Sequence, residues 1–229
     1  MSMEETTSGT TMAEEPDVLD AAGEAAVGAG VSGAGNGPSR RKLESRRKLL
    51  TAARRLFVER GYHETRPQDI SREAGVGHGT FYLHFEDKLD CFLAFTDEAA
   101  NELEEVLDSH LENVGTIEEV VRQILIGTLE YSEAHPGVLA AALTDVTVLS
   151  KGDAGRKTAA ARWAEGWARL IDGWKQSKQI SLDIDSQIAG QALVGATKQA
   201  GGHASRMHLD REFYIDNMTR LFVGALKSQ

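Results

Sequence analysis

The sequence predicts an all-α fold in which a small domain of three helices precedes a larger helical domain. Apolar residues recur at intervals of three and four along most of the chain, which is the spacing of an amphipathic helix. No segment shows the convincing alternation of a half-buried strand, and the sequence contains only four prolines. Two of these, Pro16 and Pro38, lie within the first 38 residues, so long helices can run uninterrupted through the remainder.

Composition and charge divide the chain into three segments. Residues 1–39 carry seven acidic residues and no Lys or Arg, with almost no large apolar residue, so we expect a disordered acidic tail. Residues 40–88 carry twelve Lys and Arg against seven Asp and Glu, a net charge of +5 in a chain of net charge −10. Residues 89–229 form the expected second domain and are acidic. A basic segment in an acidic protein creates the local field to which a phosphate backbone is attracted.

The basic segment has the pattern of three helices with a tight turn between the last two. The first helix begins near Arg46 and ends at Gly61, a residue typical of helix C-termini. Thr65 and Gln68 have the spacing of a capping box, which predicts a second helix to about Glu73. A turn at residues 74–76 then leads to a third helix over about 77–84. We expect the core of this domain to contain Leu56, Phe57, Ile70, Phe81 and Phe85.

Helical spacing continues through the second domain. Asp87 is the expected cap of a long helix that carries Phe92 to Leu107, and Thr116 with Glu119 forms a second capping box. Pro136-Gly137 interrupts the helix that follows. Further helices are expected over residues 138–149, 154–177, 185–206 and 210–227.

Two short helices joined at a glycine, and braced by a third, form a helix-turn-helix, whose second helix can lie in the major groove of DNA. The stretches 50–65 and 69–88 resemble the first helix, the turn and the recognition helix of the tetracycline-repressor (TetR) family, and the resemblance covers residues 46–92. Beyond residue 92 the resemblance is one of architecture and length. It implies a dimer that binds operator DNA and releases it when a small molecule enters the C-terminal domain.

The resemblance and the residue chemistry together predict a set of DNA contacts. Thr80 can donate to a phosphate or touch a thymine methyl group, and Tyr82 and His84 resemble phosphate-contacting positions of the family. Alternatively, Tyr82 packs in the core and His84 caps its helix. Gly77 and His78 depart from the commoner family residues, so the operator sequence is not predicted. The expected DNA-binding residues are Arg46, Thr65, Arg66, Gly77, His78, Gly79, Thr80, Tyr82, His84 and Lys88.

A further basic cluster lies at the start of the basic segment. It consists of Arg40, Arg41, Lys42, Arg46, Arg47 and Lys48. Next to a recognition unit it is interpreted as a flexible basic arm that follows the minor groove or the phosphates, with a solvated charged face as the alternative.

The second domain is expected to dimerise and to bind an effector. Small residues are frequent over 185–206, and with the apolar face of 210–227 they resemble the family's dimer interface; tight packing within one subunit is the alternative. The middle helices are expected to enclose a pocket for a small-molecule effector. Its candidate residues are Phe95, Tyr131, His135, Leu139, Trp163 and Trp167, although each aromatic residue could equally belong to the core.

Other function classes find little support in the sequence. No glycine-rich phosphate loop, nucleophile elbow or metal motif is present, so we expect no enzyme, no metal and no cofactor. The single cysteine, Cys91, excludes a disulfide within one chain, and no apolar run could span a membrane, which favours a cytoplasmic protein. The leading hypothesis is a sequence-specific repressor. A nonspecific architectural DNA binder, a sensor that has lost DNA binding and an activator of the same fold remain alternatives.

Overall fold

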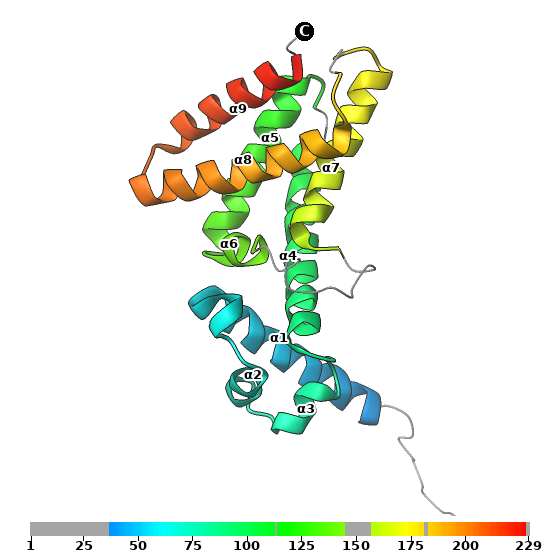
Figure 1. The fold of residues 1–229 in the computed structure, drawn as a ribbon, viewed down its shortest axis with the longest axis vertical. Helices are drawn as coiled ribbons and strands as arrows, with labels where there is room; N and C mark the ends of the chain where they lie inside the picture. The colour runs from blue at the N-terminus through cyan, green and yellow to red at the C-terminus, as the bar shows by residue number, and fades with distance from the viewer. Residues whose placement is uncertain (1–36, 113, 145–156, 181–182, 228–229) are drawn as a thin grey trace, which may run out of the picture. The chain divides into compact units, whose positions relative to one another are not determined.

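The computed structural model describes residues 37–112, 114–144, 157–180 and 183–227, and these form helices joined by turns (Figure 1). Within these ranges there is no strand, in agreement with the predicted all-α class. Apart from residues 37–39, the predicted acidic tail lies outside them, as do residues 145–149 and 154–156 of two predicted helices. No described helix is both long and apolar enough to cross a lipid bilayer.

The first three helices form the predicted helix-turn-helix unit. They are α1 (Gly37–Glu64), α2 (Pro67–Glu73) and α3 (His78–Tyr82). Gly61 interrupts α1 with a φ of 78°, and Gly75 has a φ of 66° in the turn between α2 and α3. Such positive φ values suit glycine, because a Cβ atom would be strained there.

The first helix begins at Gly37 and not near Arg46, so the basic cluster is helical and the predicted flexible arm is wrong. Arg and Lys favour helices.

The next helices follow the predicted caps. Asp87 accepts from the backbone N–H of Asp90 and opens α4 (Lys88–Leu111). Thr116 and Glu119 form the predicted capping box of α5 (Ile117–Ala134). Gly137 then adopts a φ of 81° before the short α6 (Val138–Ala142), which ends earlier than predicted.

Three longer helices complete the described chain. Thr158 caps α7 (Ala159–Gln176), so this helix begins later than the predicted residue 154. Asp185 caps α8 (Ser186–Met207), and α9 spans Arg211–Lys227, both close to the predicted ranges.

The buried residues form two clusters that α4 connects. The first joins α1, α2 and α3 to the N-terminal half of α4, and it contains Phe57, Phe81 and Phe92. The second lies among α5, α7, α8 and α9, and it contains Trp167, Ile171 and Phe222. Leu103 of α4 belongs to the first cluster, whereas Leu111 packs against the second. One continuous helix therefore links the helix-turn-helix unit to the C-terminal helices.

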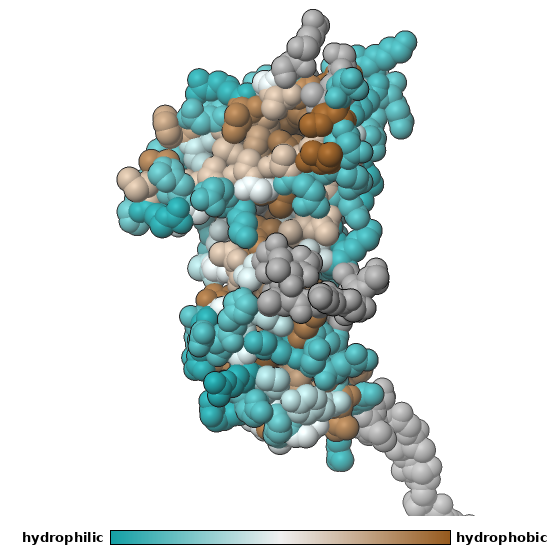
Figure 2. Space-filling model, in the orientation of Figure 1, coloured by the Kyte–Doolittle hydropathy of each residue, from teal (hydrophilic) through white to brown (hydrophobic). Residues whose placement is uncertain are grey.

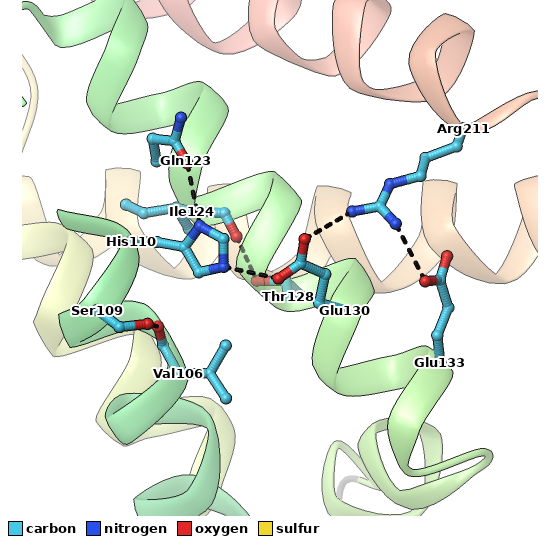
Figure 3. A network of polar contacts seen from close by, with 9 residues as sticks. All are labelled: Val106, Ser109, His110, Gln123, Ile124, Thr128, Glu130, Glu133 and Arg211. Carbon is cyan, nitrogen blue, oxygen red and sulfur yellow. Dashed lines mark hydrogen bonds and ion pairs between the residues drawn. The ribbon is translucent and has the colours of Figure 1, made fainter.

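Polar contacts add to these links. Arg54 of α1 donates through both terminal nitrogens to the Glu102 carboxylate of α4, at 2.6 and 2.8 Å, and Tyr131 of α5 donates to the same carboxylate at 2.7 Å. At the far end of α4, His110 contacts Glu130 of α5 at 2.7 Å (Figure 3). Arg211 of α9 reaches the same Glu130, so this second network joins α4, α5 and α9.

Candidate DNA interface and effector cavity

The short helix α3 presents one buried and one exposed side. Phe81 is fully buried against the core, while Tyr82 is 51 % exposed. His78 lies one turn before Tyr82, and the two rings meet edge to face with centroids 5.2 Å apart. Gly77, His78 and Gly79 are exposed as well, and Thr80 is partly exposed. This outward set contains half of the predicted DNA-binding residues, and Phe81 and Phe85 occupy the core as predicted.

No neighbour within the described chain requires that position 79 be a glycine. A Cβ atom built there would have no neighbour within 4 Å. Gly79, one of the expected DNA-binding residues, is therefore not in close contact with the described residues of this chain.

His84 follows α3 and is held by α1. Its Nε2 lies 2.7 Å from the hydroxyl of Ser45, and the guanidinium of the exposed Arg46 lies over the Phe85 ring at 5.4 Å. Partial burial lowers the pKa of His84, and the charges of Lys42 and Arg46 lower it further. A neutral imidazole beside two cations is a group that an approaching phosphate would help to protonate.

Thr65 departs from its predicted roles. It is fully buried, and its hydroxyl donates to the carbonyl of Gly61 at 2.8 Å and weakly to that of Leu56 at 3.3 Å. It therefore satisfies carbonyls beside the kink in α1 and neither caps α2 nor reaches DNA. Arg66 occupies the N-cap position of α2, makes no side-chain cap hydrogen bond and is exposed.

Lys88 also turns toward the chain itself. Its ammonium lies 2.9 Å from the carbonyl oxygen of Tyr62 and 4.2 Å from the centroid of the Tyr62 ring. Burial lowers the pKa of this ammonium. The end of a helix offers unpaired carbonyls, which attract a cation, so the predicted phosphate contact of Lys88 is not the arrangement in this structure.

A cavity of about 1030 Å³ opens among α4, α5, α6, α7, α8 and the start of α9. Leucine and tryptophan side chains make up much of its wall: Leu103, Leu107, Leu125, Leu129, Leu139, Trp163 and Trp167. The indole N–H of Trp163 is buried and has no hydrogen-bond partner among the described residues, so it can serve an incoming acceptor. Arg169 and Arg206 are exposed residues of the lining. The cavity is large enough for a drug-sized or larger amphipathic molecule.

The predicted effector residues divide between this cavity and the core. Leu139, Trp163 and Trp167 line the cavity as predicted. Phe95 is fully buried in the first cluster and Tyr131 is engaged with Glu102, so neither lines it. His135 packs against the Tyr131 ring at 4.6 Å and is absent from the lining too. Burial explains Phe95 and Tyr131, because a packed core selects aromatic side chains as strongly as a ligand does. His135 is only partly buried, and its contact with the Tyr131 ring accounts for its position.

Sequence reasoning missed most of the cavity wall. Leu103 and Leu107 on α4, and Leu125 and Leu129 on α5, recur at helical spacing. That spacing also describes an ordinary buried helix face, so no signal in the sequence distinguishes the two roles.

The outer surfaces of α8 and α9 carry exposed apolar and small residues. Ile188, Phe213 and Leu221 are 62 %, 58 % and 58 % exposed, and Ala192 and Gly195 are exposed as well. Figure 2 shows this region largely in brown and tan, in contrast to the mostly teal surface over α2 and α3. Not all of the small residues face outward, because a Cβ atom at Gly190 would lie 2.2 Å from the carbonyl oxygen of Ala164 on α7. Gly190 thus serves the alternative role, close packing within the subunit.

The three N-terminal helices and the exposed polar side of α3 form a helix-turn-helix unit. The family of bacterial regulatory proteins named after tetR matches residues 49–95. The matched segment comprises α2, α3 and the adjoining parts of α1 and α4, and it carries the similarity to the TetR family. The predicted resemblance to this family is confirmed for residues 49–95. The predicted all-α class is confirmed for the residues that the structure describes.

Two relatives and one solved structure illustrate the similarity. The transcriptional repressor BepR of Brucella suis biovar 1 is 41 % identical over 64 residues, which cover 28 % of this chain and 31 % of BepR. The fatty acid metabolism regulator of Bacillus subtilis is 23 % identical over 156 residues, 65 % of this chain and 77 % of the relative. The structure of FadR from Bacillus subtilis in complex with stearoyl-CoA is 18 % identical, with a TM-score of 0.61, and it covers 78 % of this chain and 98 % of that one. The chain thus spans less than a third of BepR, and the similarity to FadR concerns the fold.

Proposed function

We propose that this protein is a homodimeric repressor that binds operator DNA through α3 and leaves it when an amphipathic effector occupies the cavity. The observation that carries the DNA-binding part is the division of α3 into a buried Phe81 and an exposed polar side. A helix so anchored can enter a major groove with His78, Thr80 and Tyr82 toward the duplex. Such a regulator acts where the DNA is, so we place it in the cytoplasm.

Operator binding is tested with a palindromic fragment from the protein's own promoter. An electrophoretic shift assay at about 0.15 M salt should show at least ~1000-fold preference over random DNA of equal length. Equal affinity for the two fragments would favour the nonspecific architectural alternative and contradict sequence-specific repression. Transcription in a reconstituted assay separates repression from activation, because both require the same DNA contacts.

The effector is proposed to have an apolar body and a polar or anionic end. The leucine and tryptophan wall suits an alkyl or ring system, and the Trp163 indole N–H together with Arg169 or Arg206 suits an acceptor or an anion. A FadR of the same fold is known in complex with stearoyl-CoA. We therefore choose long-chain acyl-CoA and the free fatty acid as the first probes.

A pair of glycine variants on α7 tests the cavity. Gly166 lines it, and a Cβ atom there would meet only the Arg169 guanidinium at 3.8 Å, so Gly166→Leu should fill part of the space. Gly173 lies on the same helix, is exposed and lines no part of the cavity, so Gly173→Leu is the matched control. Stearoyl-CoA should raise the Tm of the wild type and of Gly173→Leu and release their operator complexes, with little effect on Gly166→Leu. Equal responses of the two variants would place the effector elsewhere.

Dimerisation is proposed to use the outer faces of α8 and α9. Exposed Ile188, Phe213 and Leu221 would leave water there, and exposed Ala192 and Gly195 would allow two helices to approach closely. Two copies are required on geometric grounds, because a palindromic operator presents two half-sites about one helical turn apart.

A further inference from the structure

A second cationic site lies beside the recognition helix, where the N-terminal turns of α1 approach the end of α3. A groove of about 350 Å³ separates the two, and it is lined by Arg41, Lys42, Ser45, Leu83 and His84. Three of these residues precede position 49, where the match to the family begins. The groove is thus built partly from a segment that the family match does not include.

The groove is held in place by contacts on both of its sides. The Ser45 hydroxyl lies 2.7 Å from Nε2 of His84, which fixes the α1 segment against the end of α3. Arg41 and Lys42 precede Ser45 by one helical turn, so all three project from the same side of α1. Arg46 packs over the ring of the buried Phe85 and anchors the next turn. Two cations therefore stand at a defined distance from the recognition helix instead of on a flexible arm.

The charges in this groove are not neutralised within the described chain. Among the described residues neither Arg41 nor Lys42 forms an ion pair, and both are exposed. The nearby Glu44 pairs with Lys48 at 3.0 Å. Arg40 and Arg47 do not line the groove, and helical spacing places them on the side of α1 that carries Glu44. Lys42 and Arg46 in turn help to lower the pKa of His84, after the larger effect of burial, so their field reaches the groove.

We propose that this groove binds a backbone phosphate segment of the operator, adjoining the part of the duplex that α3 reads. The inference rests on the proposed function, because it takes α3 to lie in the major groove. A strand that passes the end of α3 at His84 meets Arg41 and Lys42 next, and their ammonium and guanidinium groups are the usual partners of phosphate oxygens. Leu83, 71 % exposed at the wall of the groove, offers an apolar surface to a deoxyribose.

Two double variants of equal charge test the groove. R41A/K42A removes the two cations inside it, whereas R40A/R47A removes two from the opposite side of the same helical turns. Affinity for operator and for random DNA is measured across a series of salt concentrations. For R41A/K42A the slope of log K against log salt should fall by about 1.8 for each bound subunit, or about 3.6 for a dimer, and binding at ~0.15 M salt should weaken at least tenfold. The ratio of operator to random affinity should stay constant, because phosphate contacts carry no sequence information.

The control separates a local contact from a general charge effect. R40A/R47A should change the slope by less than half as much, although its net charge is the same. Equal slopes for the two double variants, or a wild-type slope for R41A/K42A, would overturn the proposed phosphate site while leaving operator recognition intact. If instead the wild type shows no operator preference, the proposed function fails, and the slopes on random DNA still decide whether the groove binds phosphate. Circular dichroism checks that α1 remains helical in both.

Discussion

The outward side chains of α3 differ in what they can offer a duplex. Tyr82 presents a phenol hydroxyl on a ring that is steadied by His78, with ring centroids 5.2 Å apart. His84 presents an imidazole whose position is fixed by Ser45. In contrast, the Thr65 hydroxyl donates hydrogen bonds to carbonyl oxygens of α1. Residues that share one motif therefore divide into those that face the solvent and those that maintain the fold.

Tyr82→Phe isolates the contribution of the hydroxyl. We expect operator affinity to fall about tenfold, because a hydrogen bond to a charged phosphate oxygen contributes roughly 1.5 kcal/mol or more. The Tm should not change, since half of the side chain is exposed and the ring is kept. Fluorescence anisotropy with a labelled operator measures the affinity. Unchanged binding would support the alternative in which Tyr82 only packs.

His84 should make operator binding depend on pH. Its pKa is lowered in the free protein, by burial first and then by Lys42 and Arg46, while a bound phosphate would raise it. A group whose pKa rises on binding takes up a proton, so affinity should increase as the pH falls from about 8 to about 6. His84→Gln should flatten this dependence without altering the salt slope at high pH. A profile of equal steepness in the variant would contradict a role for His84.

Thr65→Val tests whether this buried hydroxyl acts on the fold alone. Valine keeps the shape but removes the donor to Gly61, so the free energy of unfolding should fall by roughly 1–2 kcal/mol. Urea denaturation measures the loss. Under conditions in which both proteins are fully folded, operator affinity should be the same. If the folded variant nevertheless bound the operator more weakly, the result would support the original prediction that Thr65 contacts DNA.

The helix α4, like α5 and α7, contributes residues to both buried clusters. The Arg54, Glu102 and Tyr131 contacts join it to α1 on one side and α5 on the other. Next to this cluster, a Cβ atom at Gly137 would lie only 2.7 Å from Val58 of α1, so the turn before α6 packs directly on the helix-turn-helix unit. Gly137 also lines the cavity, which gives an effector a short physical route to α1.

Tyr131→Phe should weaken the link between α4 and α5. Burial raises the pKa of Glu102, but the hydrogen bonds from Arg54 and Tyr131 outweigh this and hold it below its ordinary value of 4.5. Stability from these bonds is therefore present above pH 4.5 and is lost as the pH falls through the lowered pKa. We expect the variant to lose about 1 kcal/mol at pH 7, because the carboxylate is partly exposed.

Urea melts at several pH values measure this effect. The difference between the wild type and Tyr131→Phe should shrink once Glu102 is protonated. A difference that is constant down to pH 3 would show that the hydroxyl acts independently of the Glu102 charge.

At the scale of the whole molecule, the proposed function requires two copies with their recognition helices at a fixed spacing. The exposed apolar residues of α8 and α9 supply the proposed contact, and the effector cavity lies directly behind them, since Val194 and Gly201 of α8 line it. A ligand that binds one conformer more tightly than the other would shift the population of dimers with the correct spacing.

Gly195→Arg should prevent dimerisation. A Cβ atom at this exposed position has no neighbour within 4 Å in the subunit, so the subunit itself should remain folded. Gly173→Arg, at another open position on α7, is the matched control. Light scattering after size-exclusion chromatography should give a monomer for Gly195→Arg and a dimer for the control, with operator affinity lost in parallel. A dimeric Gly195→Arg would move the interface to another surface.

The sequence by itself determined the all-helical class, the resemblance of residues 49–95 to the TetR family, the caps at Asp87 and Thr116 and the buried face of Phe81 and Phe85. These features depend on local spacing and on capping chemistry, which neighbouring residues express within a few positions of one another. The tertiary structure alone decided that Lys88 and Thr65 contact carbonyls of α1 and that the basic cluster is helical. It also decided that Phe95 and Tyr131 belong to the core, and that His135 packs on Tyr131 outside the cavity. Those assignments depend on which carbonyl, carboxylate or ring a side chain contacts across the fold. Helical periodicity cannot supply them, because it is the same for a residue that faces a core and for one that faces a cavity.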